Sequence, residues 1–263
     1  MRLSFDGNWC ATVTEEPLSL VPRFEGRTVR VVSYADVTER EEFLLNTFGS
    51  QECLWDMPDV LRFTPAGRQL VGAEFRVPEG SAAAEDCARV PLRPPVRPGG
   101  LRADEARDFR HEMASVHCRA PGDAVLTCLR DLDVLDGPLD ARIGIAQDLA
   151  LLVQHGSVVG WSLSDPARYL TASYTDPDPN PPTAAVRRLF TECLDLITQP
   201  LILDVEDGEP AALERLRAAD QALRGQQEAP HRADALRTFI SQLVEDYIDL
   251  PANGTDSSTA ATD

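Results

Sequence analysis

Two strand–turn–strand patterns constrain the fold of this chain more than any other feature of its sequence. In the first, 59–78, apolar residues alternate with polar or small ones along the second arm, which is the period of a half-buried strand. The second, 148–166, repeats its spacing: an aspartate, a glycine eight residues later, a Val-Gly pair and a proline six residues beyond that pair. A chain that holds two such units is predicted to build a mostly antiparallel sheet.

The shared spacing has two interpretations. Either the hairpins are an internal duplication, with related halves that meet at a cleft or a joint sheet, or they share only generic turn chemistry. The turn glycines, Gly67 and Gly156, are expected to supply a positive φ. Gly72 and Gly160 lie in mid-strand, which predicts a bulge or a close approach of another backbone.

Helical patterns appear between and after the hairpins. A capping box at 38–41 predicts a helix over 39–48, and apolar steps of three and four predict another over 102–117. The short apolar run 201–205 is typical of a strand. Two amphipathic segments, 209–224 and 231–249, predict neighbouring antiparallel helices.

The predicted fold class is therefore α+β: a mostly antiparallel sheet from two hairpin-bearing halves, with flanking helices and a C-terminal helical hairpin. A stretch rich in proline, alanine and glycine separates the halves, and a tail rich in serine, threonine and aspartate ends the chain. The predicted organisation is an N-terminal half, a linker, a second half, a C-terminal helical pair and a disordered tail, over 1–78, 79–100, 101–205, 206–251 and 252–263.

The charge balance limits the partners of such a chain. Its 43 acidic residues outnumber 25 basic ones, for a formal net charge of -18. A polyanion gains nothing from approaching this surface, so nucleic acid and anionic membranes are not expected partners. A basic protein or a small molecule is compatible with it.

All 25 basic residues are arginine, because the sequence holds no lysine. The P-loop, the pyridoxal Schiff base and the protein-kinase ATP site each need a lysine. Those activities are excluded in their usual form. A composition rich in arginine, alanine and proline is also typical of GC-rich bacterial genomes.

The cysteines and the N-terminus indicate a cytoplasmic protein. The six cysteines are scattered without a CxxC pair, which favours reduced, buried thiols over a disulfide framework. An acidic residue at position 6 and the lack of an apolar stretch argue against a signal peptide. No apolar run approaches the length of a membrane span.

The candidates for catalysis are two carboxylates and two histidines. Asp131 and Asp133 belong to the densest carboxylate cluster, where acid–base work or a hard cation competes with a plain solvated turn. His111 would lie on one helix face with Cys118, as a zinc or Cys–His site would require, but an ordinary polar face explains the same pattern. His155 lies at the second hairpin turn. No metal and no cofactor is predicted.

The candidates for ligand binding are aromatic residues and arginines near the hairpins. Trp55 and Trp161 could line a site, although core packing explains Trp161 as well. Arg62 and Arg168 flank the hairpins and could hold a carboxylate or a phosphate, or could simply balance an acidic surface.

No motif in the chain identifies a reaction, so the sequence does not decide whether the protein is an enzyme. The leading hypothesis is a non-catalytic interaction module, such as an adaptor or an immunity-type inhibitor, that binds a basic protein. The alternative is an enzyme or small-molecule binder of a specialised bacterial pathway, with a carboxylate-lined site between the two halves. A concave pocket between the halves would favour the alternative.

Overall fold

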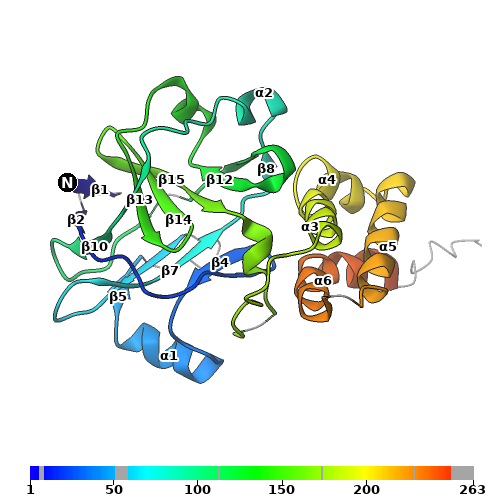
Figure 1. The fold of residues 1–263 in the computed structure, drawn as a ribbon, viewed down its shortest axis with the longest axis horizontal. Coiled ribbons are helices and arrows are strands. Elements are labelled where there is room, and N and C mark those ends of the chain that lie inside the picture. Colours follow the sequence, from blue (N-terminus) through cyan, green and yellow to red (C-terminus); the bar gives the residue numbers. More distant parts are fainter. Residues whose placement is uncertain (6–8, 51–58, 112, 173, 228, 250–263) are drawn as a thin grey trace, which may run out of the picture.

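The chain folds into two β-sheets with a group of helices at one end, and the α+β prediction is confirmed (Figure 1). The computed structural model describes residues 1–5, 9–50, 59–111, 113–172, 174–227 and 229–249.

The larger sheet holds ten strands among the described residues, in the order β10-β2-β1-β15-β12-β11-β8, with β14, β13 and β9 continuing from β15. Most of its pairs are antiparallel, as predicted, and three are parallel: β1–β15, β8–β11 and β9–β13. Its strands are β1 (Arg2–Ser4), β2 (Cys10–Thr14), β8 (Gly80–Ser81), β9 (Val96–Pro98), β10 (Gly100–Ala103), β11 (Val116–Arg119), β12 (Val125–Leu129), β13 (Ala141–Ala146), β14 (Leu149–Gln154) and β15 (Ser157–Ser164).

The smaller sheet is antiparallel throughout the part that the structure describes, in the order β3-β4-β7-β6-β5. Its strands are β3 (Arg23–Glu25), β4 (Thr28–Val31), β5 (Phe48–Gly49), β6 (Val60–Phe63) and β7 (Leu70–Arg76).

Both predicted hairpins are present, and they face each other across the core. The first, β6–β7, belongs to the smaller sheet, and the second, β14–β15, belongs to the larger one. Phe75 of β7 and Trp161 of β15 are in ring contact, with centroids 5.4 Å apart. Side chains of both sheets share one apolar core, as in other packed pairs of sheets. The interpretation of the two hairpins as an internal duplication stays a hypothesis.

Each hairpin carries a β-bulge just before its mid-strand glycine. The pairing register skips Val71 in the first hairpin and Val159 in the second. Because side chains alternate between faces, the second bulge moves Val159 away from the face of Trp161. Val159 packs with Leu152 in a smaller apolar cluster on the other side of the sheet, away from Trp161.

Both mid-strand glycines are sites of close approach, and the predicted approach of another backbone is confirmed at Gly160. A Cβ on Gly72 would lie 2.7 Å from the ring of Phe43, and a Cβ on Gly160 would lie 2.2 Å from the carbonyl oxygen of Cys128. In a β-sheet, only glycine permits a contact as short as the second one.

The turn glycines behave differently in the two hairpins. His155 and Gly156 have φ of 52° and 73°, the signs of a tight type I′ hairpin turn. In the first hairpin the positive φ, 55°, falls on Arg68. The prediction is therefore right for Gly156 and wrong for Gly67.

The helices gather mostly at the C-terminal end of the chain. Phe24 of β3 contacts both Phe190 and Phe239, so the smaller sheet packs against this group. The predicted C-terminal pair is present as α5 and α6, and α3 packs against both. The helices are α1 (Val37–Leu45), α2 (Ala84–Cys87), α3 (Ala184–Leu196), α4 (Leu201–Glu206), α5 (Pro210–Arg224), α6 (Pro230–Val244) and a π-helical turn, η5 (Glu245–Asp249).

Three local predictions need correction: the bounds of one helix, and the type of structure over 102–117 and over 201–205. The helix predicted over 39–48 begins and ends earlier, because Asp36, rather than Thr38, caps α1 by accepting a hydrogen bond from the backbone N–H of Glu39. Gly49, just after the predicted end of this helix, is a strand residue of β5.

The helix predicted over 102–117 does not form. Phe109 stacks on Trp9 with ring centroids 3.7 Å apart, and its backbone N–H donates to the carbonyl of Gly49. Asp104 accepts hydrogen bonds from Arg2 and Thr12. These long-range contacts outweigh a weak helical pattern. The proposed helix face that combined His111 with Cys118 is therefore absent.

The run 201–205 is the helix α4 instead of a strand. Ile202 and Val205, three residues apart, are its buried side chains. A five-residue apolar run fits either period, so the sequence could not decide between them.

The predicted linker 79–100 contains β8, α2 and β9, and the division into domains stays a prediction. Within the described ranges, none of the helices has the length and apolar character needed to cross a membrane.

Candidate functional site

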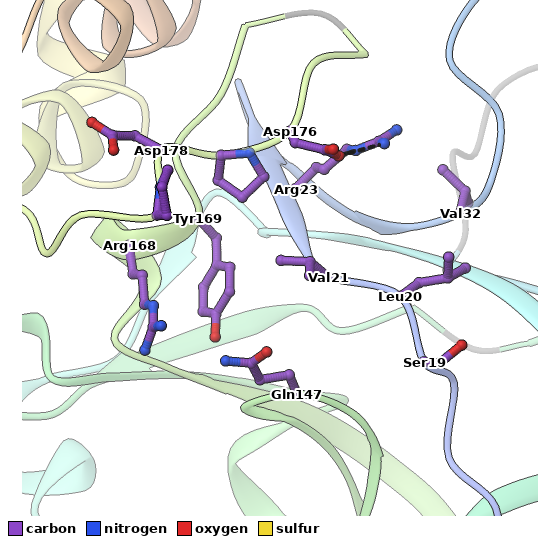
Figure 2. Close-up of a pocket in the computed structure, with 12 residues that line it drawn as sticks. Ser19, Leu20, Val21, Arg23, Val32, Gln147, Arg168, Tyr169, Asp176 and Asp178 are labelled. Carbon is purple, nitrogen blue, oxygen red and sulfur yellow. Dashed lines mark hydrogen bonds and ion pairs between the residues drawn. The ribbon is translucent and has the colours of Figure 1, made fainter.

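A pocket of about 450 Å³ lies between the N-terminal segment and the region after the second hairpin (Figure 2). Segment 19–23 and Val32 form one wall, and loop 176–179 forms the opposite one. The β13–β14 turn contributes Gln147, and the short 3₁₀ helix η4 (Pro166–Tyr169) contributes Arg168 and Tyr169. The pocket therefore joins residues from both predicted halves of the chain.

Prolines restrict the backbone of the loop that forms this wall, and hydrogen bonds from Arg232 anchor it. Prolines at 177, 179, 181 and 182 fix the backbone in an extended form. Arg232 of α6 is 2% exposed and donates to the carbonyls of Asp178, at 3.0 Å, and Asn180. Its guanidinium also lies 3.6 Å from the Asp178 carboxylate. The loop is thus anchored to the helical group.

The N-terminal wall is joined to the loop by Arg23. Its guanidinium donates to the carbonyl of Tyr34 at 3.0 Å and to the carboxylate of Asp176 at 2.7 Å and 3.2 Å. Figure 2 shows this pair at one side of the pocket. The Asp176 side chain is 82% exposed, so this ion pair adds little stability.

Tyr169 forms the floor of the pocket and is held from both ends. Tyr169 is 1% exposed, and its hydroxyl donates a hydrogen bond to the carboxylate of Asp148. Burial, followed by the nearby Asp148 carboxylate, raises the pKa of Tyr169. Asp165 precedes η4 with a φ of 49°, and Arg187 holds its carboxylate through two hydrogen bonds of 2.6 Å and 3.1 Å.

Both carboxylates of the pocket lie in ion pairs with arginines, whereas Arg168 of the pocket does not lie in one with any described residue. Asp176 is paired with Arg23, and Figure 2 shows the Asp178 carboxylate turned away from Tyr169 towards the helices. A hydrogen bond from the backbone N–H of Asn180 lowers the pKa of Asp178 against the opposing effect of burial, and the side chain of Asn180 and the charge of Arg232 lower it further. Arg168 is exposed, and its guanidinium has no ion-pair or hydrogen-bond partner among the described residues.

The four predicted catalytic residues occupy separate environments. Asp131 lies 3.2 Å from the guanidinium of Arg130, and Asp133 is exposed within the 3₁₀ helix η3 (Leu132–Asp136). His111 packs edge-to-face on Phe5, with ring centroids 5.3 Å apart. His155 is exposed in the second hairpin turn. None of these four residues lines the pocket.

Of the four residues predicted to bind a ligand, one lies in the pocket. Trp55 lies outside the described residues. Trp161 is fully buried in the core. Arg62 donates to the carbonyls of Leu44 and Thr47 at the end of α1. Arg168 lines the pocket, so one of the described candidates lies where a ligand could reach it.

Sequence reasoning missed Arg23, Gln147 and Tyr169 because they are far apart along the chain and belong to no motif. The alternation of aspartate and proline over 176–179, eight residues after Arg168, is the available signal for this site in the sequence. The folding of residues 19–23 against this loop has no local signature.

Two buried titratable groups lie away from the pocket. Burial raises the pKa of Asp59 to about 7, against the opposing effect of a hydrogen bond from the backbone N–H of Arg76. Burial lowers the pKa of His117 to about 4, with a further contribution from the charge of Arg119. Within the described ranges, no three metal-ligating side chains gather at one place.

Comparison with known proteins gave no matching family model, no matching curated protein and no matching solved structure.

Proposed function

We propose that this protein binds a small organic molecule in the pocket between segment 19–23 and loop 176–179. The observation that carries this proposal is the pocket itself: a concave site of about 450 Å³ to which both halves of the chain contribute. Its volume falls in the range of small-molecule sites, and clefts between structural units are common places for them.

The composition of the walls supports the same conclusion. Leu20, Val21 and Pro177 offer apolar surface, and Arg168 and Gln147 offer polar groups that could fix the orientation of a ligand. The buried Arg232 anchors the loop to α6, so the site is largely formed before a ligand arrives.

A second candidate function is the interaction module for a basic protein. Asp204, Glu206, Asp207 and Glu209 are exposed around the turn between α4 and α5, and none of them is in an ion pair with another described residue. Such a patch would raise the association rate with a basic partner more than it would raise the affinity of the complex.

The proposal is tested by screening a fragment library against the ¹⁵N-labelled protein and following chemical-shift changes. We expect fragments that shift signals of residues 19–23, 147 and 168–179. Ser19→Trp, which places an indole at the exposed edge of the pocket, should abolish these shifts. Ser241→Trp, on the exposed face of α6, is the matched control and should leave them unchanged. If no fragment binds these residues, the proposed function is wrong.

A further inference from the structure

We infer that the ligand of this pocket is an organic anion, whose carboxylate or phosphate group binds to the guanidinium of Arg168. This inference rests on the proposed function and specifies the chemical class of the ligand.

The first step is the local charge of the pocket. The protein as a whole carries a formal charge of -18, yet the lining of the pocket contains two arginines and two aspartates. Arg23 and Asp176 neutralise each other at one side, 2.7 Å apart. The Asp178 carboxylate is turned towards Arg232, which lies outside the pocket lining and adds a third positive charge nearby.

The second step is the position of the remaining cation. Figure 2 shows the Arg168 guanidinium and the Gln147 amide on the side of the pocket to which the Tyr169 hydroxyl points. Arg168 has no partner among the described side chains, so its donors are free to make paired hydrogen bonds to a carboxylate or phosphate. The amide of Gln147 could donate one more.

The third step is the negative group that opposes this binding. Asp148 accepts the hydrogen bond of Tyr169 and is exposed, although it does not line the pocket. Its charge should weaken the binding of an anion without abolishing it, because Asp148 is exposed and water and salt reduce the effect of an exposed charge. This predicts opposite effects of neutralising Asp148 and Arg168.

The fourth step is the body of the ligand. Leu20 and Val21 face the prolines of loop 176–179 across the pocket, and Val21 is 44% exposed. Covering this surface is favourable in proportion to the apolar area removed from water. The anionic group should therefore be attached to a compact apolar or aromatic body.

The test uses three matched probes, phenylacetate, phenylacetamide and phenethylamine, with phenyl phosphate as the second source of an anion. Dissociation constants are measured by NMR titration of the full-length protein. We expect phenylacetate to bind about tenfold or more tightly than its amide, since a hydrogen-bonded charge pair is stronger than a neutral contact. We expect the ammonium probe to bind most weakly. The ratio between the two anions tells carboxylate from phosphate ligands.

The variants separate the charge of Arg168 from its structural effects. Arg168→Gln should lower the affinity for phenylacetate about tenfold and remove the preference over the amide, whereas Arg168→Lys should keep part of it. Asp148→Asn should raise the affinity for phenylacetate. Arg188→Gln, an exposed arginine of α3 outside the pocket lining, makes the same change in net charge and should have no effect.

The possible failures are distinguishable. If the acid and the amide bind the pocket equally, and Arg168→Gln binds both as the wild type does, the inference is wrong while the proposed function stands. If none of the probes or fragments shifts signals from the pocket, the proposed function itself is overturned.

Discussion

Asp59 is buried at the start of β6, and no charged group of the described residues is paired with its carboxyl group. It is 3% exposed, and the backbone N–H of Arg76 donates to it at 2.9 Å. Its neutral form is favoured because charging a group away from water is costly. At neutral pH, the folded protein must therefore either keep this proton or tolerate a buried negative charge.

The raised pKa of Asp59, about 7 against an ordinary value of 3.8, predicts a pH-dependent loss of stability. Between about pH 4 and 7, the folded state holds a proton that the unfolded state has released, so stability falls as pH rises. Relative to Asp59→Asn, the free energy of unfolding of the wild type should fall by roughly 1.4 kcal/mol per pH unit in this interval. Urea denaturation at several pH values measures the difference.

The comparison with Asp59→Asn is needed because His117 acts in the opposite direction. With a pKa lowered to about 4, buried His117 stays neutral, so its contribution to stability is lost as pH falls from 6.5 towards 4. The two effects offset each other in the wild type. Parallel stability curves for the wild type and Asp59→Asn would contradict the assigned pKa of Asp59.

At the scale of elements, strand β15 depends on a glycine. Gly160 has a φ of 157°, and a Cβ there would meet the backbone of the neighbouring strand β12 at 2.2 Å. Backbone atoms of a paired strand cannot move aside as a flexible side chain can. The bulge at Val159 and this contact together set the register of three neighbouring strands.

Gly160→Ala should therefore destabilise the protein by about 3 kcal/mol or more. Gly208→Ala is the matched control, because Gly208 also has a positive φ, 74°, but has open space where its Cβ would lie. It should cost only about 1 kcal/mol, the usual strain of a left-handed alanine. Equal losses in urea denaturation would show that the contact with β12 is not what requires glycine.

For the whole molecule, the excess of carboxylates should make stability depend on salt. A net charge of -18 on one folded chain repels itself, and salt screens that repulsion. Raising NaCl from about 10 to about 150 mM at pH 7, which shortens the Debye length from about 30 to about 8 Å, should raise the Tm by a few degrees.

The control is the same pair of scans near pH 4.6, where the net charge is close to zero. There the salt effect on Tm should nearly vanish. A Tm that is independent of salt at pH 7 would mean that the arginine–carboxylate pairs already compensate the acidic excess locally.

Features that depend on neighbours along the chain can be predicted from the sequence. The alternation over Ala73–Arg76 of β7, the tight turn at Gly156 and the amphipathic faces of α5 and α6 follow from local periodicity and backbone preference, and each is confirmed. The special role of Gly72 and Gly160 was also predictable, because a glycine in mid-strand signals a bulge or a close contact.

The other features depend on contacts between residues that are far apart in the sequence. Phe109 forms no helix because it stacks on Trp9, a hundred residues earlier, and the free energy of that contact exceeds a helical preference of a few tenths of a kcal/mol per residue. The pocket likewise brings Arg23, Gln147 and Arg168 together through sheet packing and the fastening of loop 176–179 by Arg232. Contacts between residues so distant in sequence leave no periodic signal. For this reason Arg168 is the one residue of these three that was predicted from the sequence to bind a ligand.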